Sequence, residues 1–500
     1  MKTVVSTDLM RKSDAAEIAA GTPSRELMRR AGEAVYQSYP WKGRVAILCG
    51  VGNNAGDGYV LALCLSKAGI PCRLILLEKS FSTDGLHYFE KCMKRGIPWT
   101  LFSEDTDFCE DREIADCIFG TGFHGEANGL AARMIEKANR SGLPVVAVDI
   151  NSGMNGDSGS GKNAICSDIT VAIGSYKTGH FLGDAKDMIG RLSCVDIGIP
   201  ILKEEGSFAL IEGADVKRAI GARAQNTHKG TYGYVAILGG CAEYAGAMKL
   251  ANLSCAALRA GCGVATLAVP KSLASGVSPY LLESTLALMP DTDGRMLFDE
   301  AALDALMEGK RALAVGMGWG RSEENARILS YLLKTYRGSL LIDADGLNAL
   351  ATLEPSALRE ATCQVALTPH PKEFSRISGF SMEEIIADPI GKARSFAKAH
   401  GVCLLLKGAC TVVTDGNEAY LINRGCAGMA TAGSGDVLSG ILAGLLGYLP
   451  LTPLTLSCGA YIAGRAGELA EKEINSVSML ASDTVSQISC VIGEILNCEA

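Results

Sequence analysis

Short runs of β-branched and other apolar residues alternate with longer helix-period segments along this chain, and this alternation constrains the fold most strongly. Residues 44–49, 72–77 and 145–150 are predicted as buried strands, and residues 57–67 are predicted as a helix between the first two. Strands that are apolar on both faces and connected through helices form parallel sheets. We therefore predict an α/β fold with doubly wound sheets.

The length of the chain, 500 residues, exceeds the size of an ordinary single domain, so we expect more than one domain. A first series of strands ends near residues 194–200, and a polar stretch at 203–227 follows it. We predict two doubly wound α/β domains, residues 1–215 and 216–500. Strands of the second domain are expected at residues 234–238, 265–269, 312–315, 339–343, 364–367 and 402–406.

Composition excludes several classes of protein. A net charge of -8 argues against nucleic-acid binding through neutralisation of the phosphate backbone. The 18 cysteines lie mostly in apolar runs, and the N-terminus is too charged for a secretory signal. No apolar run reaches the ~20 residues that a membrane span needs. We expect a cytoplasmic homo-oligomer with small-molecule substrates and with no nucleic-acid or membrane partner.

A small-residue loop at 432–435 leads into an apolar helix that is expected to open with Asp436. Glycines let the backbone approach a ligand closely, and the free N–H groups of a helix start attract an anion such as phosphate. A carboxylate at that position would repel the phosphate. We therefore interpret Asp436 as a base for a nucleophile beside the phosphate. The alternative is that Asp436 only caps the helix.

A glycine-rich segment, residues 50–58, follows a predicted strand and opens the helix expected from residue 57. It loosely satisfies the dinucleotide fingerprint, with Glu78 at a suitable distance to bind a ribose. Asp57 at the start of the helix would oppose a pyrophosphate, and Asn53 and Asn54 are bulky for the tight turn. A nicotinamide dehydrogenase is therefore disfavoured.

Two more polar loops, residues 116–123 and 148–154, follow predicted strands. The carboxyl ends of parallel strands meet at one edge of a sheet, where open α/β folds bind ligands. Each loop alone could be an ordinary Asp/Gly turn. Together with residues 50–58, they predict a pocket that contains amides, hydroxyls and carboxylates.

The motifs Asn-Asn-x-Gly-Asp-Gly, Phe-Gly-Thr-Gly and Asp-Ile-x-Ser-Gly in these loops resemble the NAD(P)H-hydrate epimerase domain in order and spacing. The resemblance implies that Asp149 is the acid/base group, with Lys177 nearby unless Lys177 is only a surface lysine. It implies a potassium ion on oxygen ligands of Asn54, Asp116 and Ser152. The implied hydrate-binding residues are Asn53, Asn54, Ala55, Gly56, Asp57, Gly120, Thr121, Gly122, Phe123, His124, Gly125, Glu126 and Asp149.

Four positions depart from the patterns of the families that this chain resembles. Ala55 stands where the epimerase usually has Gly, which adds a methyl group in a tight loop. Asn151 stands where it usually has Pro, which is expected to loosen a turn without moving a chemical group. Ala432 and Ser434 lie in a loop that usually reads Gly-Gly-Thr-Gly-Asp, and the anion-binding N–H groups are expected to survive both changes.

Five further segments accompany Asp436: residues 228–233, 244–248, 316–320, 368–374 and 406–411. Together they resemble the ADP/ATP-dependent NAD(P)H-hydrate dehydratase domain, which has a ribokinase-like fold. The resemblance implies ADP as co-substrate and Mg²⁺ on its phosphates. The implied hydrate-binding residues are Gly246, Gly318, His370 and Asp436, and the implied nucleotide-binding residues are Lys407, Gly408, Ala409, Cys410, Thr411 and Gly435. His370 alone could instead be a structural histidine.

The order of the two domains resembles that of the bifunctional NAD(P)H-hydrate repair enzymes. The resemblance implies epimerisation of the R and S hydrates, followed by dehydration of the S form to NAD(P)H, with ADP converted to AMP and phosphate. One alternative is a ribokinase-like vitamin or sugar kinase fused to a ligand-binding domain. Another is that the N-terminal half is a non-catalytic interaction module. The polar residues Asp149, Asn54 and Asp116 argue against such a module, because burying them costs energy.

Overall fold

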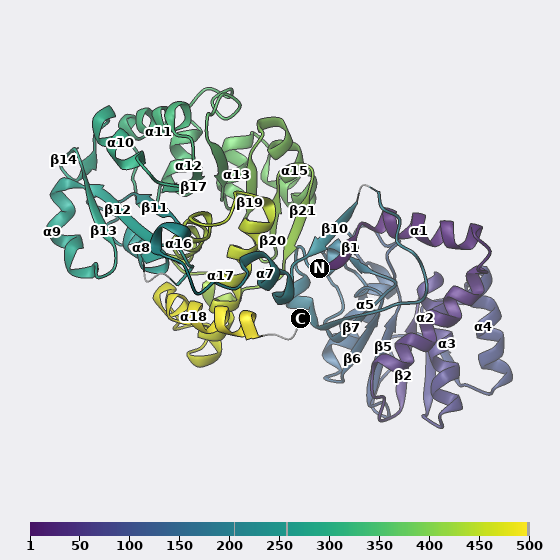
Figure 1. Cartoon of the computed structure of the whole chain (residues 1–500). Helices are drawn as coiled ribbons and strands as arrows, with labels where there is room; N and C mark the ends of the chain where they lie inside the picture. The colour runs from purple at the N-terminus through teal and green to yellow at the C-terminus, as the bar shows by residue number, and fades with distance from the viewer. Residues whose placement is uncertain (205, 257–258, 498–500) are drawn as a thin grey trace. The chain divides into compact units, whose positions relative to one another are not determined.

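A computed structural model describes residues 1–204, 206–256 and 259–497, which form two compact units (Figure 1). The N-terminal unit is Thr3–Phe208, and the C-terminal unit is Met1–Lys2 with Ala209–Ala500. The expected boundary at residue 215 lies inside helix α7 (Gly213–Ile220). The stretch expected to be a polar connection also contains strand β10 (Ser207–Leu210).

The N-terminal unit has a seven-stranded sheet in the order β4-β3-β2-β5-β6-β7-β9. Its neighbouring strands all pair in parallel. The chain moves outward from β2 to β4 and then returns to the other side of β2, so the strand order reverses between β2 and β5. Such a switch point opens a crevice at the carboxyl ends of the strands. The strands are β2 (Val45–Cys49), β3 (Cys72–Leu76), β4 (Trp99–Leu101), β5 (Glu113–Cys117), β6 (Val145–Val148), β7 (Ser167–Ile173) and β9 (Ile189–Val195).

Helices cover both faces of this sheet, as the apolar strands predicted. Ile47 of β2 packs in one core cluster with Leu9 and Tyr59, whereas the next residue, Leu48, packs in another with Met134. The doubly wound prediction is therefore confirmed for this unit. One face carries α1 (Thr7–Ala19), α2 (Ser24–Ser38), α3 (Asn53–Lys67) and α4 (Thr83–Lys94), and the other carries α5 (Gly129–Arg140). A short parallel pair is formed by β1 (Lys2–Val5) and β8 (Tyr176–Lys177), and a one-turn helix is α6 (Ala185–Met188).

Two helices begin earlier than the sequence predicted. Helix α3 begins at Asn53, so Asp57 lies in its second turn and not at its start. Helix α16 (Ser434–Leu446) begins two residues before Asp436, and its N-cap is Gly433 in a left-handed conformation. The prediction that Asp436 caps the helix is therefore wrong. Glycine accepts this backbone conformation without steric cost, which lets the helix begin there.

The C-terminal unit contains the strand order β13-β12-β11-β16-β17-β18-β19-β20-β21-β10. Pairing is parallel from β13 to β19, antiparallel on both sides of β20, and parallel between β21 and β10. Here the strand order reverses between β11 and β16. The strands are β11 (Tyr234–Leu238), β12 (Val264–Pro270), β13 (Thr285–Met289), β16 (Ala312–Val315), β17 (Ser339–Ile342), β18 (Gln364–Leu367), β19 (Cys403–Leu406), β20 (Thr411–Thr414) and β21 (Ala419–Ile422), with a separate hairpin of β14 (Asp291–Thr292) and β15 (Arg295–Met296).

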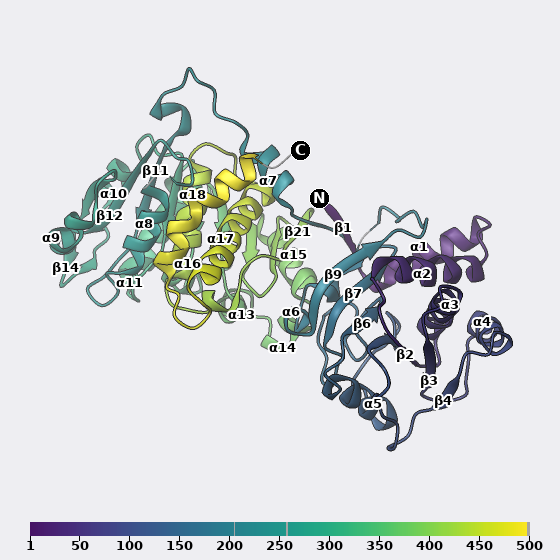
Figure 2. The ribbon, with the colours of Figure 1, turned by 90° about the horizontal axis from the view of Figure 1, so that it is seen from below.

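Helix α16 lies at the centre of the core on one face of this sheet. Its residues from Val437 to Leu446 are all buried, and it packs against β11, β16 and α8. Figures 1 and 2 show α8 and α16–α18 on this face and α10–α13 on the other. The helices are α8 (Ala247–Ala256), α9 (Ala274–Val277), α10 (Glu300–Met307), α11 (Glu323–Thr335), α12 (Asp345–Leu350), α13 (Pro371–Ser378), α14 (Met382–Ala387), α15 (Pro389–His400), α17 (Pro453–Glu473) and α18 (Ala481–Asn497). Among the described residues, no helix combines the length and apolar character that crossing a membrane requires.

Gly316, directly after β16, has no room for a side chain. Its φ is 114°, and a Cβ atom there would lie 2.0 Å from the carbonyl oxygen of Asp343. Gly316→Ala should therefore lower the free energy of unfolding by about 2 kcal/mol or more, through backbone strain and overpacking. Differential scanning calorimetry of the full chain measures the effect. Gly276→Ala is the control, because its Cβ would meet no atom within 4 Å and its φ is not in the left-handed region. Equal melting of the Gly316→Ala variant and the unmodified chain would contradict the prediction.

Candidate active sites

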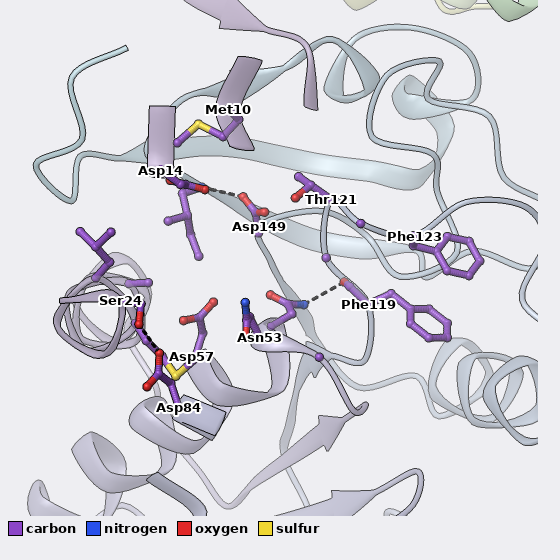
Figure 3. Close-up of a pocket in the computed structure, with 18 of the residues that line it drawn as sticks. Met10, Asp14, Ser24, Asn53, Asp57, Asp84, Phe119, Thr121, Phe123 and Asp149 are labelled. Atoms are coloured by element: carbon purple, nitrogen blue, oxygen red, sulfur yellow. Dashed lines mark hydrogen bonds between the residues drawn. The ribbon is translucent and has the colours of Figure 1, made fainter. Parts of the chain in front are cut away.

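A cavity of about 750 Å³ lies at the switch point of the N-terminal sheet (Figure 3). This volume is typical of small-molecule sites. Residues of α1 and α2 form part of its wall, and the loops after β2, β5 and β6 form most of the remainder. The three polar loops predicted to share one pocket therefore do so. The predicted site residues that line it are Asn53, Asn54, Asp57, Gly120, Thr121, Gly122, Phe123, His124, Asp149 and Lys177.

Four residues of the implied hydrate-binding set do not line this cavity. Ala55 is buried in the core, and Gly56 packs against Met28. Both residues therefore contribute to the packing of helix α3. Gly125 and Glu126 lie further along the loop, and the Glu126 carboxylate forms an exposed ion pair with Lys162. Ala55 and Gly56 therefore act on the cavity only through the position of the helix.

Asp149 follows β6 in a left-handed backbone conformation, with a φ of 68°. Its N–H donates to the carbonyl of Val171 (2.9 Å), and its Oδ1 accepts from the N–H of Ile173 (3.0 Å). A non-glycine residue in this region costs on the order of 1–3 kcal/mol and persists where the surroundings enforce it. The strain directs the Asp149 carboxylate into the cavity, as Figure 3 shows.

Lys177 is buried, with only 1% of its side chain exposed, so the alternative of a surface lysine is wrong. Its Nζ donates to Oδ1 of Asp149 and to the carbonyl of Ile173 (2.8 Å). His180 is hydrogen-bonded to the backbone of both residues. Its Nδ1 accepts from the Lys177 N–H (3.0 Å), and the proton of the neutral ring therefore lies on Nε2, which donates to the Asp149 carbonyl (2.7 Å). Burial, aided by the positive charge of Lys177, lowers the pKa of His180 to about 4 and keeps it neutral.

The residues implied as potassium ligands lie together between the loops after β2, β5 and β6. Asp116 is fully buried, and it accepts from the hydroxyl (2.6 Å) and the N–H (2.8 Å) of Ser152. The Asn54 amide donates to the carbonyl of Phe119 (2.8 Å), and the buried Oδ1 of Asn54 has no hydrogen-bond partner among the residues that the structure describes. An unpartnered amide oxygen beside a buried carboxylate fits an alkali cation, which prefers oxygen ligands.

Asn151 holds its loop more tightly than the sequence predicted. Its Nδ2 donates to the carbonyls of Ile165 and Met188, both at 2.9 Å, and its Oδ1 accepts from the hydroxyl of Thr170 at 2.5 Å. The expectation of a loosened turn is therefore wrong, because these side-chain bonds replace the rigidity that proline would supply.

Asp14 of α1 is a cavity residue that sequence reasoning missed. It lines the cavity beside Asp149 and Lys177 (Figure 3). Burial, together with the nearby Asp149 and against the opposing effect of Lys177, raises its pKa to about 6. No local signal distinguishes Asp14 from Asp8, an exposed acid on the same helix.

Asp436 lies in the first turn of α16, half-buried and close to two other ionisable side chains. Burial first, and then the charge of Asp343, raise its pKa to about 7, while Lys407 opposes the shift. The buried Asp343 accepts from Nζ of Lys407 (2.8 Å) and from the Ser439 hydroxyl (2.6 Å). This places a base that can titrate near neutral pH beside a lysine.

The predicted anion site adjoins this cluster. A Cβ added at Gly435 would lie 3.5 Å from Nζ of Lys407, so the start of α16 lies directly beside this lysine. The Oγ of Ser434 and the Oγ1 of Thr368 are buried, and neither has a hydrogen-bond partner within the described part of the chain. Unpartnered hydroxyls and free N–H groups at a helix start suit a phosphate. Gly408 and Ala409 are exposed in the turn between β19 and β20, Cys410 is buried, and Thr411 begins β20.

His370 has the structural role that the sequence left open. It is the N-cap of α13, and its Nδ1 accepts from the N–H groups of Lys372 (3.2 Å) and Glu373 (3.3 Å). Burial, and then Lys407, lower its pKa and favour the neutral ring. Its Nε2 lies 3.4 Å from the Glu373 carboxylate. A role in binding the hydrate would use this second nitrogen.

Gly246 and Gly318 are brought together, but the segment at 228–233 is not. A Cβ atom at Gly318 would lie 2.5 Å from the carbonyl oxygen of Tyr244. Tyr244 and Gly246 belong to the same loop, directly before α8. A Cβ at Gly233 would instead lie 1.9 Å from the carbonyl of Gly447, at the far end of α16. Asp436 lies at the near end, so about 17 Å of helix separates them. This segment therefore lies at the opposite end of α16 from Asp436, because it precedes β11 whereas the site lies after it.

Among the described residues, no group of three or more His, Cys, Asp and Glu side chains is placed to hold a metal ion. A divalent ion in the C-terminal site would therefore take most of its ligands from bound phosphates and water, as Mg²⁺ commonly does.

Solved structures support the fold of the C-terminal unit. A ribokinase-like superfamily protein from Enterococcus faecalis covers 59% of this chain and 99% of its own, at 20% identity and a TM-score of 0.52. The ADP/ATP-dependent NAD(P)H-hydrate dehydratase from Bacillus subtilis, crystallised with ATP and Mg²⁺, covers 58% of this chain and 99% of its own. Its identity is 25% and its TM-score is 0.50.

Sequence comparisons cover both units. The family described as YjeF-related protein N-terminus matches residues 24–179, and the family described as NAD(P)H-hydrate dehydratase matches residues 235–489. The bifunctional NAD(P)H-hydrate repair enzyme of Moorella thermoacetica is 34% identical over 94% of this chain and 92% of its own. That of Escherichia coli is 31% identical over 97% and 93%. The chain therefore belongs to the family of bifunctional NAD(P)H-hydrate repair enzymes.

Proposed function

We propose that the N-terminal unit interconverts the R and S hydrates of NAD(P)H and that the C-terminal unit dehydrates the S hydrate with ADP. The observation that carries this proposal is the placement of one carboxylate in each unit: Asp149 lies in the cavity at the switch point of the N-terminal sheet, and Asp436 lies at the start of α16 close to Asp343 and Lys407. The membership of the whole chain in the repair-enzyme family supports the pairing of the two activities. The products of the second reaction are NAD(P)H, AMP and phosphate.

The N-terminal cavity supplies the groups that epimerisation needs. Inversion at C6 of the hydrate requires proton transfer and no redox cofactor. Asp149 is the proposed proton acceptor for the 6-hydroxyl, and Lys177 orients it. Asn54, Asp116 and Ser152 would hold a potassium ion, which supplies positive charge to a site dominated by carboxylates.

The C-terminal site supplies a base and an anion-binding loop. Asp436 accepts the proton of the 6-hydroxyl, and the hydroxyl oxygen attacks the terminal phosphate of ADP. The N–H groups from Gly433 to Asp436 stabilise the charge on the transferred phosphoryl group, and Lys407 lies beside them. Loss of phosphate from C6 and of a proton from C5 restores the dihydropyridine. Mg²⁺ on the nucleotide phosphates would supply further neutralisation, as the crystallisation of the Bacillus subtilis relative with ATP and Mg²⁺ suggests.

The first experiment incubates a mixture of the two NADH hydrate epimers with the protein and ADP, and then with ATP. Consumption of both epimers, with release of AMP and phosphate, supports the proposal. A vitamin or sugar kinase would instead phosphorylate its alcohol and leave the hydrate. Phosphorylation of vitamin alcohols without hydrate consumption would overturn the proposal.

Asp149→Asn should remove epimerisation and leave ADP-dependent dehydration unchanged. The substitution keeps the shape of the side chain but deletes the base, which typically lowers the rate by about 10²–10⁴. The measurement is the conversion of pure R hydrate to S hydrate, with dehydration of pure S hydrate as an internal control. If epimerisation is unaffected, the proton acceptor is a different residue.

Asp436→Asn should abolish dehydration and leave epimerisation and ADP affinity nearly unchanged. In the unmodified protein the rate should rise with pH through the pKa of Asp436, about 7, because the protonated acid cannot accept a proton. The variant should lose this dependence along with about 10²–10⁴ in rate. Turnover of S hydrate and calorimetric ADP affinity are the paired measurements. Equal losses of turnover and of ADP binding would point instead to a nucleotide-binding role.

Potassium should raise the melting temperature of the N-terminal unit more than sodium at equal ionic strength. A ligand present at 100 times its Kd stabilises the folded state by about 2.7 kcal/mol. Asn54→Ala should remove the difference between the two salts, because it deletes the unpartnered buried oxygen. Calorimetry in KCl and NaCl tests this without any substrate. The same response to both salts in the unmodified protein would contradict a potassium site.

A further inference from the structure

Asp14 presents its carboxylate to the N-terminal cavity. It lies on α1, whereas the other predicted site residues lie at the start of α3, on the loops after β5 and β6, and on β8. Figure 3 shows the Asp14 carboxylate pointing toward that of Asp149, and both Asp149 and Lys177 lie close enough to shift its pKa. A half-buried acid beside a second carboxylate costs free energy, so its presence in the cavity calls for a functional reason.

Asp149 is bound very differently. Its carboxylate receives the ammonium group of Lys177 and the N–H of Ile173 (3.0 Å), and both donors stabilise its negative charge. Two adjacent carboxylates in one cavity, one that accepts from an ammonium group and a backbone N–H and one that holds its proton more readily, are a base and an acid in position.

The charges around Asp14 come from three neighbouring elements. Asp149 follows β6, Lys177 lies on β8, and Asp57 lies on α3. Burial, and then Asp149 and Asp14, raise the pKa of Asp57 well above its usual range, which favours its uncharged form. His180 is neutral. Lys177 and Asp149 therefore neutralise each other, and Asp14 is left to titrate near its pKa of about 6.

We propose that Asp14 is a second catalytic residue of the epimerase cavity, the acid that exchanges a proton with the ring nitrogen of the hydrate while Asp149 exchanges one with the 6-hydroxyl. This inference rests on the proposed function of the N-terminal unit. The hydroxyl oxygen and the ring nitrogen are bonded to the same carbon, C6. Two carboxylates on the same side of the cavity can reach both atoms at once.

The reaction balances without any added reactant. Asp149 takes the hydroxyl proton, the C6–O bond becomes a carbonyl, and the C6–N1 bond breaks with its electron pair on N1. Asp14 delivers its proton to N1 and leaves an open-chain aldehyde. Rotation of the aldehyde presents its other face, and N1 attacks it while returning its proton to Asp14. Asp149 returns the other proton to the oxygen, so the ring closes with inverted C6 and both acids regain their starting states.

The test compares Asp14→Asn and Asp14→Glu with the unmodified full-length protein, using pure R epimer of NADH hydrate. Asp14→Asn should lower kcat/KM for epimerisation by about 10²–10⁴, with KM changed far less than kcat. In the unmodified protein kcat/KM should fall as pH rises through about 6, because Asp14 loses the proton that it must donate. The Asn variant should lack this inflection, and the Glu variant should recover part of the rate.

Asp8→Asn is the matched control, an identical substitution at an exposed position of the same helix. It should behave as the unmodified protein, and dehydration of S hydrate should be equal in all variants. Two results would overturn the role of Asp14 while leaving the proposed function intact. One is an epimerisation rate of the Asp14→Asn variant within threefold of that of the unmodified protein. The other is a slower variant whose rate keeps the same pH inflection. An unmodified protein that fails to convert the R hydrate would overturn the proposed function, and this inference with it.

Discussion

Parallel pairing places the carboxyl ends of neighbouring strands at the same edge of a sheet, and both candidate sites depend on this constraint. In the N-terminal unit the strand order reverses between β2 and β5, and in the C-terminal unit it reverses between β11 and β16. Loops that are far apart in sequence therefore meet at this edge in each unit. Asp149 lies in the cavity at the first switch point, and Asp436 lies close to Asp343 and Lys407, which follow β17 and β19.

Desolvation gives the two sites their acid and base groups. Asp436 and Asp14 both lie in partly buried positions that disfavour their charged forms, and a lysine nearby limits the shift in each case. Asp149 is buried too, but it is held by Lys177 and by a backbone N–H. In the proposed mechanisms, the same kind of side chain therefore acts as an acid or as a base according to the donors that surround it.

The buried polar groups of the N-terminal unit also bear on the alternative of a non-catalytic interaction module. The unpartnered oxygen of Asn54, the fully buried Asp116 and the strained backbone of Asp149 all destabilise the folded chain. A surface for protein binding needs none of them. A site that binds a cation and transfers protons uses all three.

The sequence by itself determined the strands, the doubly wound class and the three polar loops, because apolar runs and glycine-rich turns are local signals. The motifs also indicated Asp149, Asp436 and the family. Only the tertiary structure decided that Lys177 is buried, that Asn151 anchors its loop, and that Asp14 enters the cavity. Burial, pairing and proximity depend on residues distant in the chain, and no pattern on α1 distinguishes an exposed acid from one that faces a site across the fold.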